Sequence, residues 1–223
     1  MKTIRCHQIN DDISTISLDE VDIAPPGAGE VQIRVMACSV NFPDVLMIQG
    51  KYQFAPPLPF APGGEFAGEI VAVGPDVDQF KVGDRAVAGT RYGGFSELVN
   101  AEVQAVKPVP PGISFEKAAA YQTAYLTAYV ALTIRGSLKA GETLLVHGAT
   151  GGVGLAAVDL GKHLGATVIA TGGTDEKLAV VKARGADHVI NYTLPDDSLG
   201  GFREKVKGLT DGLGADVVFD PVG

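Results

Sequence analysis

Residues 144–154 read LLVHGATGGVG, and this stretch is the strongest indication of the fold. Its first three residues form a short apolar run, which is typical of a strand buried on both faces of a parallel sheet. Gly151 and Gly154 allow a tight turn and a close approach of the backbone to a ligand. Apolar residues recur at helical spacing over residues 153–164, and another apolar run follows at 167–170. The pattern is therefore strand, glycine turn, helix and strand.

This unit is the one that binds the pyrophosphate of a dinucleotide. Backbone N–H groups at a helix N-terminus carry partial positive charge and have no partner within the helix. We therefore expect Gly151, Gly152, Val153 and Gly154 to hold the cofactor's phosphates. The alternative is a structural glycine turn at a close helix–strand contact. The strand before the glycines and the helix after them favour the binding site.

Composition and charge exclude several classes of function. Of the 223 residues 46% are hydrophobic and 20% are charged, as in an ordinary soluble globular protein. The formal net charge of −8 opposes binding to nucleic acid or to an anionic membrane. The N-terminus has no apolar core of signal-peptide length, and no later stretch approaches a membrane span, so a cytoplasmic location is expected.

The two cysteines and four histidines give no metal-ligand spacing. Cys6 and Cys38 are too few for a disulfide framework and are expected to be buried reduced thiols. The histidines are well separated along the chain, at positions 7, 147, 163 and 188.

The first half of the chain is predicted to be mostly β. Short strand-like runs, Val31–Val40, Glu69–Val73 and Arg85–Ala88, alternate with segments rich in Pro, Gly and Asp. Residues 43–48 are expected to form one or two helical turns, and KPVPPGIS, residues 107–114, a stiff connector. We expect a small barrel or folded sheet.

After Ser114, a plausible N-cap, one helix is expected over residues 115–133, and then strands and helices alternate. Strands are predicted at Thr143, Thr167, His188 and Ala215–Phe219, and helices from Val153, Asp175 and about Phe202. The predicted fold class is α/β, with a β-rich domain over residues 1–123 and a doubly wound parallel sheet over residues 124–223. A complete sheet of this type has six strands, so this one is partial, and we expect a truncated chain.

Several motifs in sequence order resemble the medium-chain dehydrogenase/reductase superfamily, and within it the zinc-independent NADPH:quinone oxidoreductases of the zeta-crystallin type. They include NFPDVLMIQGKY (41–52), PGGEFAGEIVAVG (62–74), GGFSELV (93–99), HGATGGVG (147–154), GADHVINY (185–192) and ADVVFDPVG (215–223). The resemblance implies a GroES-like substrate domain followed by a Rossmann domain. It also implies NADPH as cofactor, a quinone or α,β-unsaturated carbonyl as substrate, and a homodimer.

Zinc-dependent alcohol dehydrogenases share this architecture, but their metal ligands have no match here. Their catalytic histidine lies in a Gly-His-Glu sequence, and the corresponding residues are Gly63, Gly64 and Glu65. Without imidazole or thiolate ligands a zinc ion is not held. We therefore predict no metal site.

The preference for NADPH is predicted from the end of the second strand of the parallel sheet. NAD enzymes usually place an acidic residue there to bind the ribose hydroxyls, and this chain has Gly172. The resemblance implies that Lys177 and Tyr192 contact the 2′-phosphate. The alternative is that Lys177 is a solvated helix residue and Tyr192 an aromatic residue at a strand end.

Hydride transfer depends mainly on position, in a site from which water is excluded. The resemblance implies that Asn41, Asp44 and Tyr52 line this site and that Thr127 contacts the nicotinamide. The alternative for Asp44 is a helix-capping turn, and for Tyr52 a loop-filling role. Leu46 stands where many relatives carry a tyrosine, so one polar group is lost.

Two rival functions remain open. An enoyl-thioester or alkenal reductase also delivers hydride to a conjugated acceptor, and the sequence does not reveal the pocket size that separates the two. The rival from another class is a protein that binds the cofactor with little or no turnover. It remains open because the predicted sheet lacks the strands that would form the rest of the cofactor-binding site.

Overall fold

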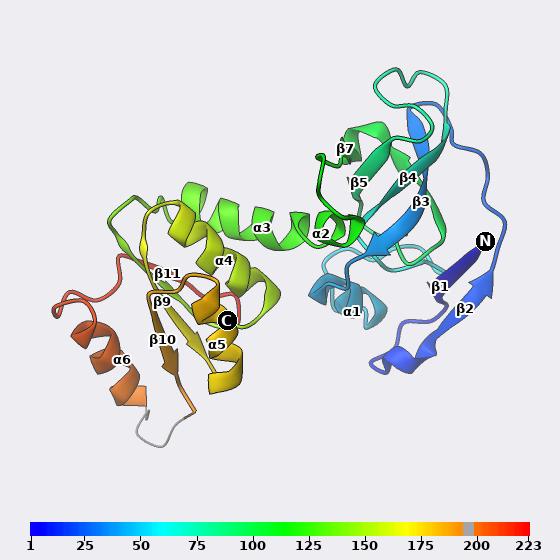
Figure 1. Ribbon diagram of the computed structural model, residues 1–223. Helices are drawn as coiled ribbons and strands as arrows, with labels where there is room; N and C mark the ends of the chain where they lie inside the picture. Colours follow the sequence, from blue (N-terminus) through cyan, green and yellow to red (C-terminus); the bar gives the residue numbers. More distant parts are fainter. Residues whose placement is uncertain (194–198) are drawn as a thin grey trace. The chain divides into compact units, whose positions relative to one another are not determined.

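The computed structural model describes residues 1–193 and 199–223 (Figure 1). The chain divides into two compact units, Met1–Thr123 and Ala124–Gly223. Among the described residues, no helix combines the length and the apolar character that a membrane span requires.

The first unit consists mainly of antiparallel strands, which confirms the predicted β-rich half. β1 (Lys2–Cys6) pairs with β2 (Ile16–Glu20). Five further strands form one sheet in the order β6-β3-β4-β5-β7. Their bounds are β3 Glu30–Cys38, β4 Glu65–Val73, β5 Arg85–Gly89, β6 Leu98–Glu102 and β7 Val106–Pro108.

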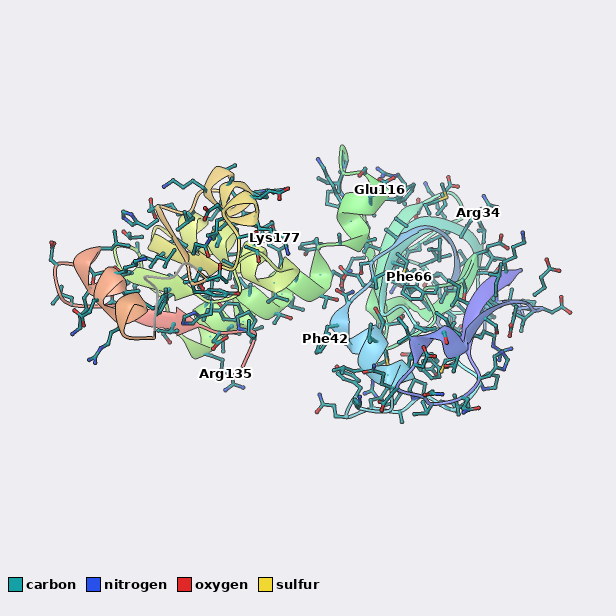
Figure 2. The ribbon with its side chains drawn as sticks, turned by 90° about the horizontal axis from the view of Figure 1, so that it is seen from below. Arg34, Phe42, Phe66, Glu116, Arg135 and Lys177 are labelled. Atoms are coloured by element: carbon teal, nitrogen blue, oxygen red, sulfur yellow. The ribbon has the colours of Figure 1, made fainter. Side chains whose placement is uncertain are left out.

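The core of this sheet is built around Phe66 on β4. Its side chain is fully buried, and Figure 2 shows it in the interior of the first unit. It pairs with Cys38 on β3 and with Ala88 on β5, so it lies on the central strand of the five. Ile33 and Ile70 are buried in the same cluster. This core fixes the ends of β3 and β4, from which the candidate site is built.

The sequence prediction missed or shortened several of these strands. β4 begins at Glu65, four residues before the predicted Glu69, because its first residues pair with β5. β7 extends into the predicted connector, where Lys107 pairs with Val87 and Pro108 with Ala86. β1, β2 and β6 mix polar and apolar residues over only five positions each, so their periodicity is weak.

The single helix predicted from Phe115 is wrong, because the structure divides it. The predicted N-cap is confirmed, since the Ser114 hydroxyl accepts a hydrogen bond from the N–H of Lys117 at 3.3 Å. α2 (Phe115–Ala119) then ends, α3 (Gln122–Tyr129) begins, and a π-helix follows over Val130–Arg135. The short helix expected at residues 43–48 is confirmed as α1 (Phe42–Ile48).

The second unit is a doubly wound parallel sheet in the order β10-β9-β8-β11. With strands numbered along the chain this order is 3-2-1-4, the arrangement of a dinucleotide-binding sheet. The strands are β8 Thr143–Val146, β9 Thr167–Gly172, β10 His188–Asn191 and β11 Val217–Phe219. The helices are α4 Gly152–His163, α5 Asp175–Ala183 and α6 Leu199–Gly208.

Helices cover both faces of this sheet. Leu144 and Val146 on β8 pack with Ala157 of α4 on one face, whereas Leu145 packs with Val206 of α6 on the other. This alternation follows from the strand period of two. α6 begins three residues before the predicted Phe202, and β11 is shorter than predicted. β11 lies at the sheet edge.

Candidate active site

The turn before α1 is held by a buried carboxylate. Asp44 is 2% exposed, and its Oδ2 accepts a hydrogen bond from the N–H of Asn41 at 2.7 Å. Its Oδ1 accepts from the N–H of Gly63 at 3.0 Å. Both oxygens therefore bind backbone groups, which ties the start of α1 to the segment before β4. This is the capping geometry that the sequence offered as the alternative role of Asp44.

A cavity of about 540 Å³ opens beside this turn and brings Asn41, Asp44 and Tyr52 together. All of the residues that line it belong to the first unit. Besides these three they are Pro43, Met47, Gln53, Phe54, Gly64, Thr90, Arg91 and Thr123. Its volume is in the range of small-molecule sites, and it combines apolar, aromatic and hydrogen-bonding groups.

Asn41 and Tyr52 bring polar groups to this cavity. The Asn41 side-chain nitrogen donates to the Ser39 hydroxyl at 2.8 Å, which orients the amide. Tyr52 is half-buried, packs against the cluster that contains Met47 and Phe60, and donates its backbone N–H to Leu46 at 3.2 Å. The amide and the phenol are, besides the carboxylate of Asp44, the hydrogen-bonding side chains that the NFPDVLMIQGKY motif brings to the cavity.

Phe54, Thr90 and Arg91 form a further part of the cavity wall that the sequence motifs did not indicate. The Arg91 guanidinium lies over the Phe54 ring at 4.6 Å from its centroid. The Phe54 ring in turn stacks on that of Tyr92, with 6.1 Å between centroids. The only sequence signal was an arginine and a tyrosine within a Gly-rich loop between two strands, which is typical of many surface turns.

A second buried carboxylate, Glu65, lies at the start of β4. It is 2% exposed, and one oxygen accepts from the Ser39 hydroxyl at 3.1 Å. The other oxygen, Oε1, accepts from the backbone N–H of Gln122. The oxygen that binds Ser39, Oε2, also accepts from the N–H of Thr123 at 3.3 Å. Glu65 thus caps α3, and this second helix start explains the division of the predicted helix.

Cys38 lies against the same pair of carboxylates. Its thiol donates to the carbonyl of Glu65 at 3.2 Å. Burial, together with the negative charges of Asp44 and Glu65, raises the pKa of this thiol to about 12. Both cysteines are free, as predicted, but only Cys6 is buried as expected, whereas Cys38 is partly exposed. At neutral pH the Cys38 thiol stays protonated.

In the second unit the predicted glycine turn leads directly into α4. Gly151 is the N-cap and has no side chain to bond the helix. A Cβ at Gly152 would have no atom within 4 Å, whereas a Cβ at Gly154 would lie 2.3 Å from the carbonyl oxygen of Gly148. Gly154 therefore allows close packing of the turn, and Gly152 borders open space. Among the described residues, no acceptor is found for the N–H groups of Gly152 and Val153.

Of the residues predicted to bind the 2′-phosphate, Gly172 and Tyr192 are adjacent, since the N–H of Tyr192 donates to the carbonyl of Gly172 at 3.2 Å. A Cβ at Gly172 would lie 2.7 Å from Cγ2 of Thr150, so the end of β9 adjoins the glycine turn. One at the following Gly173 would lie 3.4 Å from the Tyr192 hydroxyl, which is half exposed. Lys177, labelled in Figure 2, is exposed in the first turn of α5.

Thr127 lies on an exposed part of α3 in the second unit. Its nicotinamide contact stays a prediction.

The residues present do not fit the zinc site of alcohol dehydrogenases. Gly64 stands where the resemblance puts a histidine ligand, and a Cβ there would lie 3.0 Å from the Thr90 carbonyl oxygen. Across residues 1–193 and 199–223, no group of three or more His, Cys, Asp or Glu side chains is arranged to hold a metal ion.

Comparison with known proteins identifies the family. Residues 27–111 match the model of the alcohol dehydrogenase GroES-like domain, and residues 152–223 match that of the zinc-binding dehydrogenase. The chain is 37% identical over 209 residues to a mouse protein named quinone oxidoreductase-like protein 2, covering 93% of this chain and 58% of that protein.

Two solved structures extend the comparison. The Escherichia coli quinone oxidoreductase complexed with NADPH has a TM-score of 0.89 and 35% identity, and the match covers 100% of this chain and 67% of that one. The CurK enoyl reductase has a TM-score of 0.84 and 31% identity, and the match covers 97% and 66%.

The chain belongs to the medium-chain dehydrogenase/reductase superfamily, among its quinone oxidoreductase-like members. It spans 58% of the length of the mouse relative and 53% of that of a Nematostella vectensis relative, so it covers little more than half of these curated proteins.

Proposed function

We propose that this chain carries the acceptor pocket and the first part of the cofactor site of a zinc-independent NADPH-dependent reductase of quinones or α,β-unsaturated carbonyls. The observation that carries the proposal is the cavity that collects Asn41 and Tyr52 in the first unit, in a chain whose second unit has an open glycine turn at a helix N-terminus. In this proposal residues 1–123 are the GroES-like substrate domain and residues 124–223 a partial Rossmann domain.

The glycine turn supports dinucleotide binding because it meets the two steric requirements. Gly154 lets α4 approach the backbone of Gly148, and Gly152 leaves room for a pyrophosphate beside the helix N-terminus. The N–H groups of Gly152 and Val153 would donate to its oxygens. The 12-residue helix α4 adds the favourable field of its dipole.

The choice of NADPH rests on Gly172, Lys177 and Tyr192. Because residue 172 is a glycine, the end of β9 carries no carboxylate that would repel a 2′-phosphate. Gly172 is also tightly enclosed. Lys177 would supply positive charge, and the Tyr192 hydroxyl a hydrogen bond. Asp175 accepts from the Asn191 side chain at 2.6 Å, which directs that carboxylate toward β10. The NADPH complex of the Escherichia coli relative is consistent with this choice.

When bound, NADPH supplies a hydride, which is two electrons and one proton, and a further proton from solvent completes the reduction of a quinone to a hydroquinone. In the first unit, Asn41 and Tyr52 would donate hydrogen bonds to the acceptor oxygen as negative charge develops on it. Asp44 is assigned a positioning role, because both of its oxygens hold backbone N–H groups. The apolar wall around Met47 and Phe54 limits the access of water.

The test is NADPH oxidation by the protein with three acceptors: a naphthoquinone, an alkenal and an enoyl thioester. Reduction of the naphthoquinone with the highest kcat/KM supports the proposal. Preference for the thioester favours the enoyl reductase alternative, for which the CurK neighbour is the specific observation. NADPH binding without turnover of any acceptor would contradict the proposal and favour a cofactor-binding protein.

The cytoplasmic location and the homodimer stay predictions from the sequence.

A further inference from the structure

The cavity in the first unit has one accessible charge on its wall. Among the described residues that line it, Asp44 is the only aspartate or glutamate and Arg91 the only lysine, arginine or histidine. Asp44 is 2% exposed and uses both oxygens for backbone N–H groups. Arg91 is exposed. The charge that an incoming molecule meets is therefore positive, although the whole chain has a net charge of −8.

The guanidinium of Arg91 is held in place by the aromatic wall. It lies over the Phe54 ring at 4.6 Å, and Phe54 stacks on Tyr92. Stacking fixes the plane of a guanidinium while leaving its N–H donors at the edge. In the described part of the chain, no ion pair and no hydrogen bond involves the Arg91 side chain. Its donors thus remain available to a ligand.

Lys51, the cation next to Tyr52 in sequence, differs from Arg91 because its charged group already has a partner. The ammonium group of Lys51, next to Tyr52 in sequence, lies 2.6 Å from a carboxylate oxygen of Asp11. Lys51 is therefore paired with a carboxylate, whereas among the described residues Arg91 has no such partner.

From this arrangement we infer that Arg91 is a specificity-determining residue that selects acceptors carrying an anionic group, such as a carboxylate, sulfonate or phosphate, beside the ring or enone that is reduced. The inference rests on the proposed function, since it concerns the acceptor of the same pocket. A planar guanidinium can bind an anionic oxygen pair through two parallel hydrogen bonds, and the aromatic wall supports a flat acceptor ring.

The test compares menadione, which is neutral, with 1,4-naphthoquinone-2-sulfonate, which is anionic. Arg91→Met removes the charge and keeps an unbranched side chain of similar reach. We expect kcat/KM for the sulfonate to fall at least about fivefold, as the loss of a partly solvated charge pair implies, while kcat/KM for menadione changes less than about twofold. Because each variant is compared with wild type on the same acceptor, the different reduction potentials of the two quinones cancel.

Two further variants serve as controls. Arg34→Gln removes one exposed positive charge from β3 of the same unit, at a residue paired with Glu69 and outside the cavity lining (Figure 2). It should leave both quinones unaffected. Arg91→Lys retains the charge but not the planar fork, so it should recover part of the preference for the sulfonate.

The outcomes separate this inference from the proposed function. Equal losses on both quinones in Arg91→Met, or an equal loss of sulfonate reduction in Arg34→Gln, would overturn the inference and leave the reductase proposal standing. If wild type reduces neither quinone, the reductase proposal fails. Calorimetric titration with the two quinones then decides the inference, which requires the sulfonate to bind more tightly and to lose this advantage in Arg91→Met.

Discussion

The Glu65 carboxylate accepts a hydrogen bond from the backbone N–H of Gln122, so the first residue of β4 caps the first residue of α3. The two residues are 57 positions apart in the sequence. The helix that begins at this contact continues to Tyr129 and carries Thr127, the predicted nicotinamide contact. A buried acid on a strand thereby determines where a helix of the proposed cofactor site begins.

Replacing Glu65 should lower the free energy of unfolding, although its hydrogen-bond partners are uncharged groups. In Glu65→Gln one acceptor oxygen becomes an amide donor that faces a backbone donor, so the free energy of unfolding should fall by about 1–3 kcal/mol. Urea denaturation measures the change. Glu69→Gln on the same strand is the control, because Glu69 forms an exposed pair with Arg34 at 3.7 Å and should cost less than about 1 kcal/mol. Equal midpoints for the two variants would contradict the capping role.

Asp44→Asn tests whether this carboxylate acts on the backbone or on the substrate. Since its two oxygens bind the N–H groups of Asn41 and Gly63, the amide should lower the free energy of unfolding by about 1–3 kcal/mol. The pH profile of kcat/KM should keep its shape, because no proton passes through Asp44. A variant of normal stability that has lost one limb of the profile would instead assign Asp44 an acid–base role.

Of the glycines in the turn, Gly154 should affect stability and Gly152 should affect the affinity for NADPH. In Gly154→Ala the new Cβ would meet the carbonyl of Gly148 at 2.3 Å, so thermal unfolding should report a loss of about 1–3 kcal/mol. In Gly152→Ala the Cβ has open space, so stability should be kept while NADPH binding weakens at least about tenfold, or about 1.4 kcal/mol. Wild-type affinity in Gly152→Ala would refute the predicted position of the pyrophosphate.

The parallel sheet could be predicted because its signal is local. Buried runs such as residues 144–146, followed by glycines and a helical period, identify each strand and helix without tertiary information. The division of the helix at Ala120 could not be predicted from the sequence, because alanines continue the helical pattern across it. Its cause is the carboxylate of Glu65, which is distant in sequence and, as a charged residue, is expected at the surface.

The candidate site was predictable only in part for the same reason. Asn41, Asp44 and Tyr52 lie within one motif, and the structure gathers them in one cavity. Thr90 and Arg91 reach that cavity from a loop more than 35 residues away, and loop composition alone does not indicate what a loop faces.

The Cys38 thiol predicts a pH dependence of stability. Burial and the adjacent carboxylates raise its folded-state pKa from 9.0 to about 12. A raised pKa means that its contribution is complete below about pH 9 and is lost as pH rises through the folded pKa near 12. The stability difference between wild type and Cys38→Ser should therefore shift against wild type above about pH 9. A difference that is independent of pH over this range would mean that the thiol ionises at its ordinary pKa.

The most direct test of the account is titration with NADPH and with NADH, followed by the fluorescence of the reduced cofactor in a chain that contains no tryptophan. We expect NADPH to bind at least about tenfold more tightly, or about 1.4 kcal/mol. Lys177→Gln should remove most of that preference, whereas Arg184→Gln, which removes the same charge at the other end of α5, should keep it. Equal affinity for the two cofactors, or binding of neither, would contradict the assignment of Gly172, Lys177 and Tyr192 to a 2′-phosphate site.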